Sequence, residues 1–119
     1  MEKAKVYFTS EVSNDSLVKM YEVLGVNLPG KVAVKLHSGE QGNKNYLRPE
    51  FVKNLVERVN GTVVECNTAY PGARNTTEKH RKLMDEHEWT KYFNVDIMDA
   101  EGPDMELDIP NGYKLKRIM

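Results

Sequence analysis

The chain has 119 residues, of which 39% are hydrophobic and 29% charged, with a formal net charge of −1 at pH 7 and one cysteine. This balance predicts one soluble globular domain over residues 1–119 with a modest core, and it argues against a disordered chain. The near-zero net charge, without a basic stripe, argues against nucleic-acid binding. Apolar runs are too short to span a membrane, and no signal-peptide segment precedes the first strand pattern, so we expect no membrane contact and a cytoplasmic location.

Periodicity and turn residues predict alternating strands and helices. In chain order we expect a strand at 6–9, a helix at 17–24, a strand at 31–37, a helix from 49 to a stop at 61, a strand at 62–66, a helix at 76–87 and a short strand at 95–98. Residues 14–16 are candidate caps for the first helix, and Asn75 with Glu78 resembles a capping box for the third. The third helix is mostly polar, so only a narrow side carrying Leu83 and Met84 should be buried.

The order of these elements predicts the fold class. A strand–helix–strand unit over 31–66 should be a right-handed parallel crossover. Alternating residues at 105–109 and 113–115 flank Asn111-Gly112, a strong hairpin signal because both residues tolerate positive φ. We therefore expect an α/β fold, with a mostly parallel sheet, flanking helices and a C-terminal antiparallel hairpin.

Two glycine-containing loops, at 37–43 and 67–74, carry most of the chemically informative residues. Each follows a predicted strand, so both should lie at the carboxyl ends of neighbouring strands, where ligands usually bind. Glycines allow close backbone approach, and N–H groups at the following helix starts favour an anion. The ordinary alternative is turn glycines and solvated cations. The candidate ligand-binding residues for a small anionic molecule are Lys35, Gly39, Gly42, Asn43, Asn67, Thr68, Tyr70, Gly72 and Arg74, with Arg48 as a further cation.

Arg74 stands just before the cap of the third predicted helix. Its guanidinium could hold a carboxylate or phosphate through two parallel hydrogen bonds. The alternative is a surface ion pair with Glu40 or Glu78, which would contribute little to stability.

His37 and Glu40 are candidate catalytic residues, because they lie close enough in sequence to form a proton-transfer pair. They could also share a metal ion, but Cys66 or Asn67 would have to complete the ligand set, so we expect no metal. The ordinary alternative for His37 is one hydrogen bond at a strand end. Cys66 ends a buried strand and should be a packed, inert thiol. One thiolate cannot replace the usual cysteine ligands of an iron–sulfur cluster, so no cofactor is expected in this chain.

The remaining motifs favour structural roles. Trp89, Tyr92 and Phe93 predict core packing or a subunit contact. An uncovered sheet edge would favour pairing between copies, so a homo-oligomer is a further hypothesis. The acidic stretch at 96–108 lacks the glycine-centred spacing of a calcium loop and should be a solvated face.

Residues 32–43, VAVKLHSGEQGN, then 46–49, YLRP, and 67–74, NTAYPGAR, resemble the uncharacterised iron–sulfur-centre proteins, also described as domain of unknown function 362. The resemblance implies that the chain corresponds to the amino-terminal segment of longer proteins. It implies an iron–sulfur cluster only for those longer members, whose cysteine motifs lie outside this region. Ser38 stands where phenylalanine is common and Asn67 where aspartate is common, which weakens a carboxylate role in the second loop.

Three functional hypotheses follow. The first is a binding module for a small anion at the two loops. The second is an enzyme in which His37 and Glu40 transfer protons on a ligand held by Arg74. The third is a structural segment whose site needs another part of a longer protein.

Overall fold

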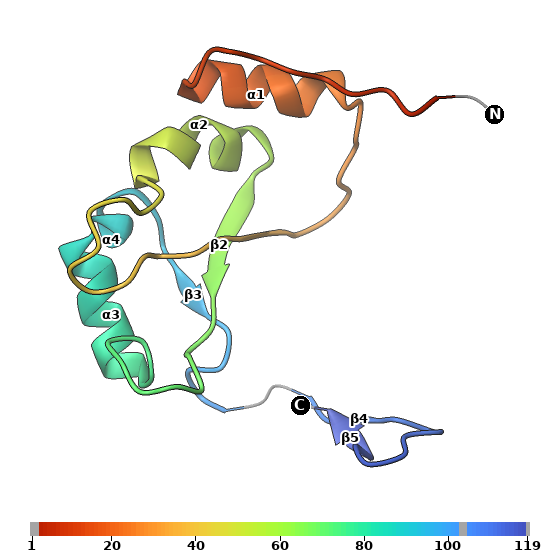
Figure 1. Ribbon diagram of the computed structural model, residues 1–119, viewed down its shortest axis with the longest axis vertical. Helices are drawn as coiled ribbons and strands as arrows, with labels where there is room; N and C mark the ends of the chain where they lie inside the picture. Colours follow the sequence, from red (N-terminus) through yellow and green to blue (C-terminus); the bar gives the residue numbers. More distant parts are fainter. Residues whose placement is uncertain (1–2, 103–104, 119) are drawn as a thin grey trace.

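The computed structural model describes residues 3–102 and 105–118. Its elements in chain order are α1 (Asn14–Val23), β1 (Val32–Lys35), α2 (Pro49–Arg58), β2 (Gly61–Glu65), α3 (Thr77–Glu86), α4 (Trp89–Tyr92), β3 (Asp96–Ile97), β4 (Leu107–Asp108) and β5 (Arg117–Ile118) (Figure 1). The α/β class is confirmed. None of the helices in these two ranges is long and apolar enough to cross a membrane.

The main sheet contains three parallel strands in the order β1-β2-β3. Val34 lies opposite Val63 in the first pair, and Glu65 lies opposite Ile97 in the second. α2 connects β1 to β2, and α3 with α4 connects β2 to β3. The carboxyl ends of all three strands therefore point the same way, and the loops that leave β1 and β2 start at one edge of the sheet.

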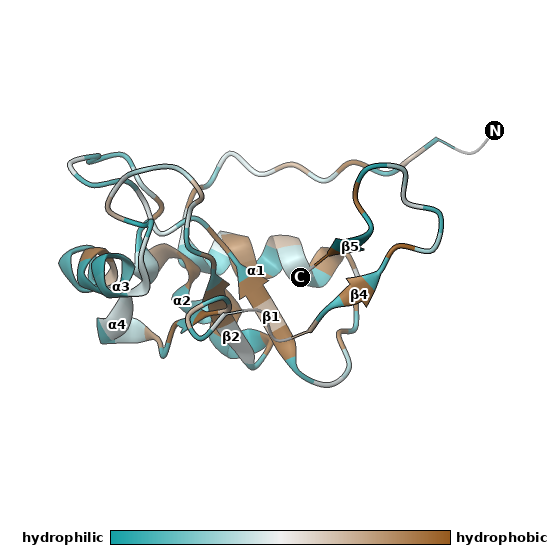
Figure 2. Cartoon of the chain, turned by 90° about the horizontal axis from the view of Figure 1, so that it is seen from below, coloured by the Kyte–Doolittle hydropathy of each residue, from teal (hydrophilic) through white to brown (hydrophobic). Residues whose placement is uncertain are grey.

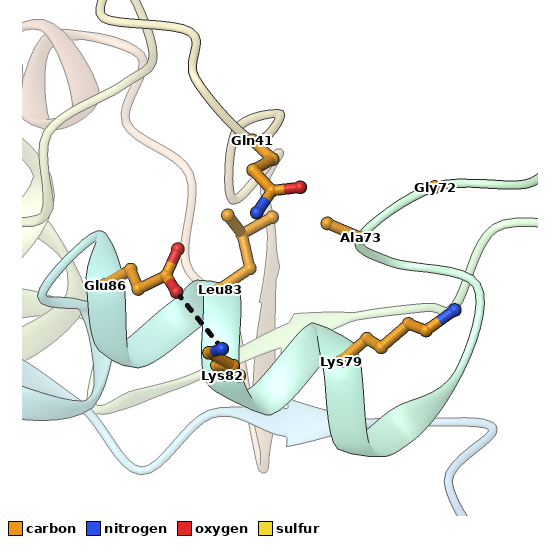
Figure 3. Close-up of a pocket in the computed structure, with 7 residues that line it drawn as sticks. All are labelled: Gln41, Gly72, Ala73, Lys79, Lys82, Leu83 and Glu86. Atoms are coloured by element: carbon orange, nitrogen blue, oxygen red, sulfur yellow. Dashed lines mark ion pairs between the residues drawn. The ribbon is translucent and has the colours of Figure 1, made fainter.

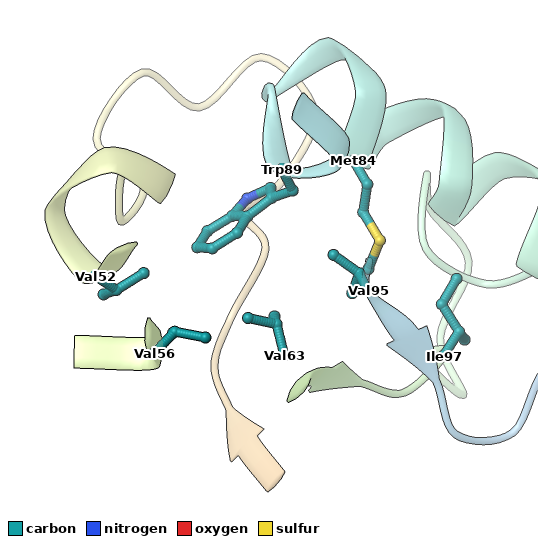
Figure 4. Close-up of a cluster of buried hydrophobic side chains, with 7 residues drawn as sticks. All are labelled: Val52, Val56, Val63, Met84, Trp89, Val95 and Ile97. Atoms are coloured by element: carbon teal, nitrogen blue, oxygen red, sulfur yellow. The ribbon is translucent and has the colours of Figure 1, made fainter. Parts of the chain in front are cut away.

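The hydrophobic core lies on the face of the sheet that carries Val63 and Ile97. The buried side chains that form it come from α2, β2, α3, α4, β3 and the residue before β3, and they are Val52, Val56, Val63, Met84, Trp89, Val95 and Ile97 (Figure 4). The predicted core role of Trp89 is confirmed. α3 is largely hydrophilic in Figure 2 and buries only His80, Leu83 and Met84, as its polar sequence predicts.

Two helix caps lie one residue or more from their predicted positions. Ser13 caps α1: its Oγ accepts from the Ser16 N–H at 3.1 Å, and the Ser16 Oγ accepts from the Ser13 N–H at 3.0 Å. Thr76, and not Asn75, caps α3 by accepting from the Lys79 N–H. The Asn75 side chain accepts from Lys79 Nζ instead, at 3.2 Å. Each observed cap is a short hydroxyl side chain, which can reach the backbone N–H of the third helical residue.

The predicted strand at 6–9 is wrong. This segment is extended and passes close to α1 in Figure 1, with no strand assigned between residues 3 and 12. Val6 and Phe8 are 88% and 87% exposed. A run of β-type residues forms a strand only where a neighbouring strand pairs with its backbone, and none pairs here among the described residues.

The antiparallel hairpin is confirmed, but its turn is wider than predicted. Leu107 pairs with Ile118, so the second strand lies at 117–118 and not at 113–115. The Gly112 N–H donates to the Ile109 carbonyl at 3.0 Å, and Gly112 does not have a positive φ. The two-residue turn with positive φ that Asn111-Gly112 predicts is therefore absent from this hairpin.

Met84 should be important to the core because it is almost fully buried between α3 and the sheet. Met84→Ala should lower the free energy of unfolding by about 2–5 kcal/mol, since it leaves a cavity that neighbours fill only partly. Urea denaturation followed by circular dichroism measures the change. Arg81→Ala, at an exposed position of the same helix, should stay within about 0.5 kcal/mol of the wild type. Equal losses in both variants would contradict this account of the core.

Candidate functional site

The loops that follow β1 and β2 lie side by side at the carboxyl end of the sheet. Tyr70 Oη donates to Glu40 Oε1 at 3.0 Å, and Arg74 Nη2 also donates to Glu40 Oε1. Arg74 Nη2 lies 3.0 Å from His37 Nε2. The predicted meeting of the two loops is therefore confirmed, and it follows directly from the parallel pairing of β1 and β2.

A buried carboxylate, Glu65 at the end of β2, ties the two loops to the sheet. Its Oε1 accepts from the Ser38 N–H at 3.1 Å and from Arg74 Nη1 at 3.2 Å. Its Oε2 accepts from Lys35 Nζ at 2.8 Å and from the Cys66 N–H at 2.9 Å. Oε1 thus has partners from both loops, and Oε2 has partners from β1 and from the residue that follows β2.

These donors decide the ionisation of Glu65. Burial by itself would raise the pKa of this carboxyl, but the hydrogen bonds from Lys35 and from the N–H groups of Cys66 and Ser38 outweigh burial and lower the pKa from 4.5 to about 2. Glu65 is therefore ionised at neutral pH. A buried carboxylate is tolerated only when its partners replace the lost hydration, as they do here.

Arg74 is 4% exposed and connects two carboxylates. Nη1 holds Glu65, while Nη2 donates to Glu40 and, at 2.8 Å, to Tyr70 Oη. The alternative of an ion pair with Glu40 is confirmed as to the partner, but the pair is not a surface contact, because the guanidinium is buried. The Nε atom has no hydrogen-bond partner among the described residues. A ligand could reach Nη2 only by taking the place that Glu40 now occupies.

Ser38, the residue between His37 and Gly39, is a second centre of hydrogen bonding and is 1% exposed. Its carbonyl accepts from Trp89 Nε1 at 3.0 Å and lies 2.9 Å from His87 Nδ1. Its Oγ lies 3.1 Å from His80 Nε2, and His80 Nδ1 lies 3.3 Å from Asn67 Oδ1. The first loop is therefore bonded to α3 and α4 through buried polar groups, and the second loop is bonded to α3.

The Ser38–His80–Asn67 chain has the order of groups found in nucleophilic catalysis, but its burial favours a structural role. Asn67 Nδ2 donates to Thr77 Oγ1 at 2.9 Å, so Oδ1 accepts from His80 and the imidazole proton lies on Nδ1. Burial lowers the pKa of His80, which keeps the ring neutral at pH 7. The Ser38 hydroxyl then donates to Nε2, and its burial keeps it from a substrate.

A stacked group fixes the far end of the first loop. The Tyr46 and His87 rings are stacked, with centroids 3.9 Å apart. The guanidinium of Arg48, which precedes α2 in the chain, lies 4.0 Å from the centroid of the Tyr46 ring. Gly39 lies against the same rings: a Cβ there would be 2.8 Å from His87 Nδ1 and from Tyr46 Cβ. Residues 39 and 46 therefore contact the same imidazole.

Several predicted ligand residues stabilise the loops themselves. Lys35 holds Glu65 and Asn67 holds His80. The Thr68 N–H donates to the Arg74 carbonyl at 2.8 Å, and the Asn43 N–H donates to the Glu40 carbonyl at 3.0 Å. These contacts give each loop a fixed shape.

A groove of about 330 Å³ opens between the two loops and α3 (Figure 3). Its lining residues come from both loops and from three turns of the helix, and they are Gln41, Gly72, Ala73, Lys79, Lys82, Leu83 and Glu86. Lys82 Nζ lies 4.0 Å from Glu86 Oε1. Lys79 Nζ has the neutral Asn75 amide as its partner, and no carboxylate of the described residues lies within 4.0 Å of it.

His37 and Glu40 are brought together, with Nε2 and Oε1 3.8 Å apart. The hydrogen bond from Arg74 is the largest cause of a lowered pKa at Glu40, so this carboxylate is ionised at neutral pH. His37 is 60% exposed at the side chain. In this arrangement Glu40 has no proton to donate, and His37 is the more exposed side chain of the two, at 60% against 41%.

Cys66 is partly buried, and burial raises the pKa of its thiol. A single, protonated thiol does not fit an iron–sulfur cluster, which needs several thiolates. Over residues 3–102 and 105–118, no group of three or more histidine, cysteine or acidic side chains could hold a metal ion.

The sequence interpretation missed Glu65, His80 and His87. One signal was available: His80, Leu83, Met84 and His87 recur at the spacing of one helical face, so the two histidines share the side that the apolar residues bury. Glu65 follows Val63 on the same face of a buried strand, which marks it as a buried carboxylate in need of partners.

A family model described as "Domain of unknown function (DUF362)" matches residues 32–119. The match covers most of the chain, from β1 through the hairpin, and the chain belongs to this family. No curated protein and no solved structure matches it.

Glu65 should make stability depend on pH. Because its folded pKa is below the ordinary value, its contribution is present above about pH 5 and is lost as pH falls toward about 2, a loss of about 3 kcal/mol in the free energy of unfolding. Glu65→Gln should be less stable at neutral pH and should lack this part of the acid dependence. Urea denaturation at several pH values tests this, and an exposed control, Glu57→Gln, should retain the wild-type profile. A wild-type profile in Glu65→Gln would contradict the assignment.

Gly39 and Gly42 provide a matched pair in the first loop. Both have positive φ, +100° and +77°, but a Cβ clashes only at Gly39. Gly39→Ala should cost about 2–4 kcal/mol, from the backbone strain and the displaced rings, whereas Gly42→Ala should cost about 1 kcal/mol. Thermal denaturation of the two variants measures both, and similar losses would mean that the contact with His87 and Tyr46 is unimportant.

Proposed function

We propose that this domain binds a small anionic molecule, carrying a carboxylate or phosphate, in the groove between the two loops and α3. The observation that carries the proposal is the position of Lys79 and Lys82 on one wall of a groove whose other wall is built from both loops. Ligand sites in open parallel sheets are typically formed by such loops at the carboxyl ends of the strands.

Charge supports an anion over a neutral ligand. The Lys79 ammonium is exposed and bound only to an amide, so an anion can approach it without breaking an ion pair in the described part of the chain. Lys82 faces Glu86 at 4.0 Å on the helix surface, a weak contact that an entering anion can replace. The two ammonium groups can therefore attract an oxyanion together.

Shape supports a small ligand. A volume of about 330 Å³ lies at the lower end of the range of small-molecule sites. Gly72 has open space where a side chain would stand, so the second loop allows a ligand to approach its backbone closely. Leu83 supplies an apolar contact in the floor for the uncharged part of the molecule.

Proton transfer by His37 and Glu40 is a second candidate function. The exposure of the His37 ring favours it, because an acid–base group must reach its substrate. The ion pair between Glu40 and Arg74 argues against proton transfer by Glu40, since a carboxylate held by a guanidinium is a weak base. Binding without turnover is therefore the first choice.

Inorganic phosphate should bind the wild-type domain more tightly than the double variant with Lys79→Gln and Lys82→Gln. The expected loss is about tenfold in affinity, because two charged donors are removed from the groove. Titration followed by amide resonances measures the affinity, and the shifts should centre on Gly72 and Ala73. Arg81→Gln removes one charge from α3 outside the residues that line the groove and should change affinity by less than about twofold. Acetate is titrated in the same way, and the proposal is refuted if neither anion binds the wild type or if the double variant binds with equal affinity.

A further inference from the structure

One carboxylate oxygen, Oε1 of Glu40, receives converging polar groups from both loops. Tyr70 Oη donates to it at 3.0 Å, Arg74 Nη2 donates to it, and His37 Nε2 lies 3.8 Å away. This is the set of groups that binds carboxylate or phosphate oxygens in ligand sites: a guanidinium, a phenol and an imidazole.

The tautomer of His37 gives this set a further N–H donor. The Gly39 N–H donates to His37 Nδ1 at 3.0 Å, so the proton of the neutral ring lies on Nε2. Arg74 Nη2 lies 3.0 Å from that atom. Two N–H donors that face each other repel, and an oxygen that accepts from both relieves the repulsion. An anion beside both donors is therefore favoured, and Glu40 Oε1, 3.8 Å from Nε2, is the nearest one.

This set of groups is fixed, whereas the carboxylate that it binds borders on solvent. The Arg74 side chain is 5% exposed and is held from behind by Glu65 through Nη1. Its Nε atom is buried without a partner among the described residues. The Glu40 side chain, in contrast, is 41% exposed. Exchange of the carboxylate for an external oxyanion leaves the Glu65–Arg74 pair intact.

This set of groups borders the proposed groove. Gln41 and Ala73, which line the groove, are the chain neighbours of Glu40 and Arg74. We propose that Glu40 is an internal ligand, whose carboxylate occupies an oxyanion receptor formed by Arg74, His37 and Tyr70 and is displaced by the carboxylate or phosphate of the bound molecule. This inference rests on the proposed function and adds the group that recognises the charged end of the ligand.

Glu40→Gln tests the inference, because it removes the competing charge while keeping the size of the side chain. Inorganic phosphate and acetate are titrated separately into the folded domain, and the amide resonances of Gly39 and Gly72 are followed. For the oxyanion that the site prefers, the dissociation constant should fall at least about tenfold relative to the wild type. The two titrations identify whether that oxyanion is a phosphate or a carboxylate. Adding Tyr70→Phe to Glu40→Gln should reverse part of the gain.

Glu57→Gln is the control for net charge, since it removes one exposed carboxylate on α2. An equal gain in Glu57→Gln would overturn the inference. Equal affinity of the wild type and Glu40→Gln for both phosphate and acetate, together with a loss in the Lys79 and Lys82 double variant, would also overturn it but would leave the proposed groove standing. No binding of either oxyanion by any variant would overturn both. Glu40→Ala is interpreted in the same way if Glu40→Gln fails to fold.

Discussion

The buried carboxylate of Glu65 is the constraint on which the arrangement of the loops depends. Removing a carboxylate from water costs several kcal/mol unless partners replace the lost hydration. Those partners come from β1 through Lys35, from the first loop through the Ser38 N–H and from the second loop through Arg74. A loop that moved away would leave the charge without one of its donors. The position of each loop is therefore coupled to the other through one side chain of β2.

The second layer of this arrangement joins the loops to the helices. The Ser38 N–H donates to Glu65 and the Ser38 carbonyl accepts from Trp89, so a single residue links the sheet to α4. Trp89 is also part of the hydrophobic core, so packing and polar bonding restrain the same atoms. The result is a rigid base beneath the exposed side chains of His37 and Glu40, and rigidity of this kind reduces the entropy lost when a ligand binds.

The sequence predicted the main sheet and the meeting of the loops, because both follow from periodicity and from the parallel order of β1 and β2. It could not predict the burial of Arg74. Hydrophobic periodicity shows which face of an element a residue lies on, but it does not show which carboxylates will pair with a buried guanidinium. The strand expected at 6–9 failed for a related reason: local composition favours an extended chain, while a strand also needs a paired neighbour. The functional hypotheses remain proposals, because loop glycines and cations accompany many kinds of ligand.

The stack of Tyr46 on His87 has a consequence for how the first loop can vary. Residues 39 and 46 both lie against the His87 ring, so the chain between them forms a loop whose two ends are close together. The entropy of closing such a loop grows only slowly with its length. Insertions between residues 43 and 46 therefore cost little in loop-closure entropy, while they alter the wall of the groove near Gln41. Changes in this short segment can therefore reshape the wall of the groove without rebuilding the buried network beneath it.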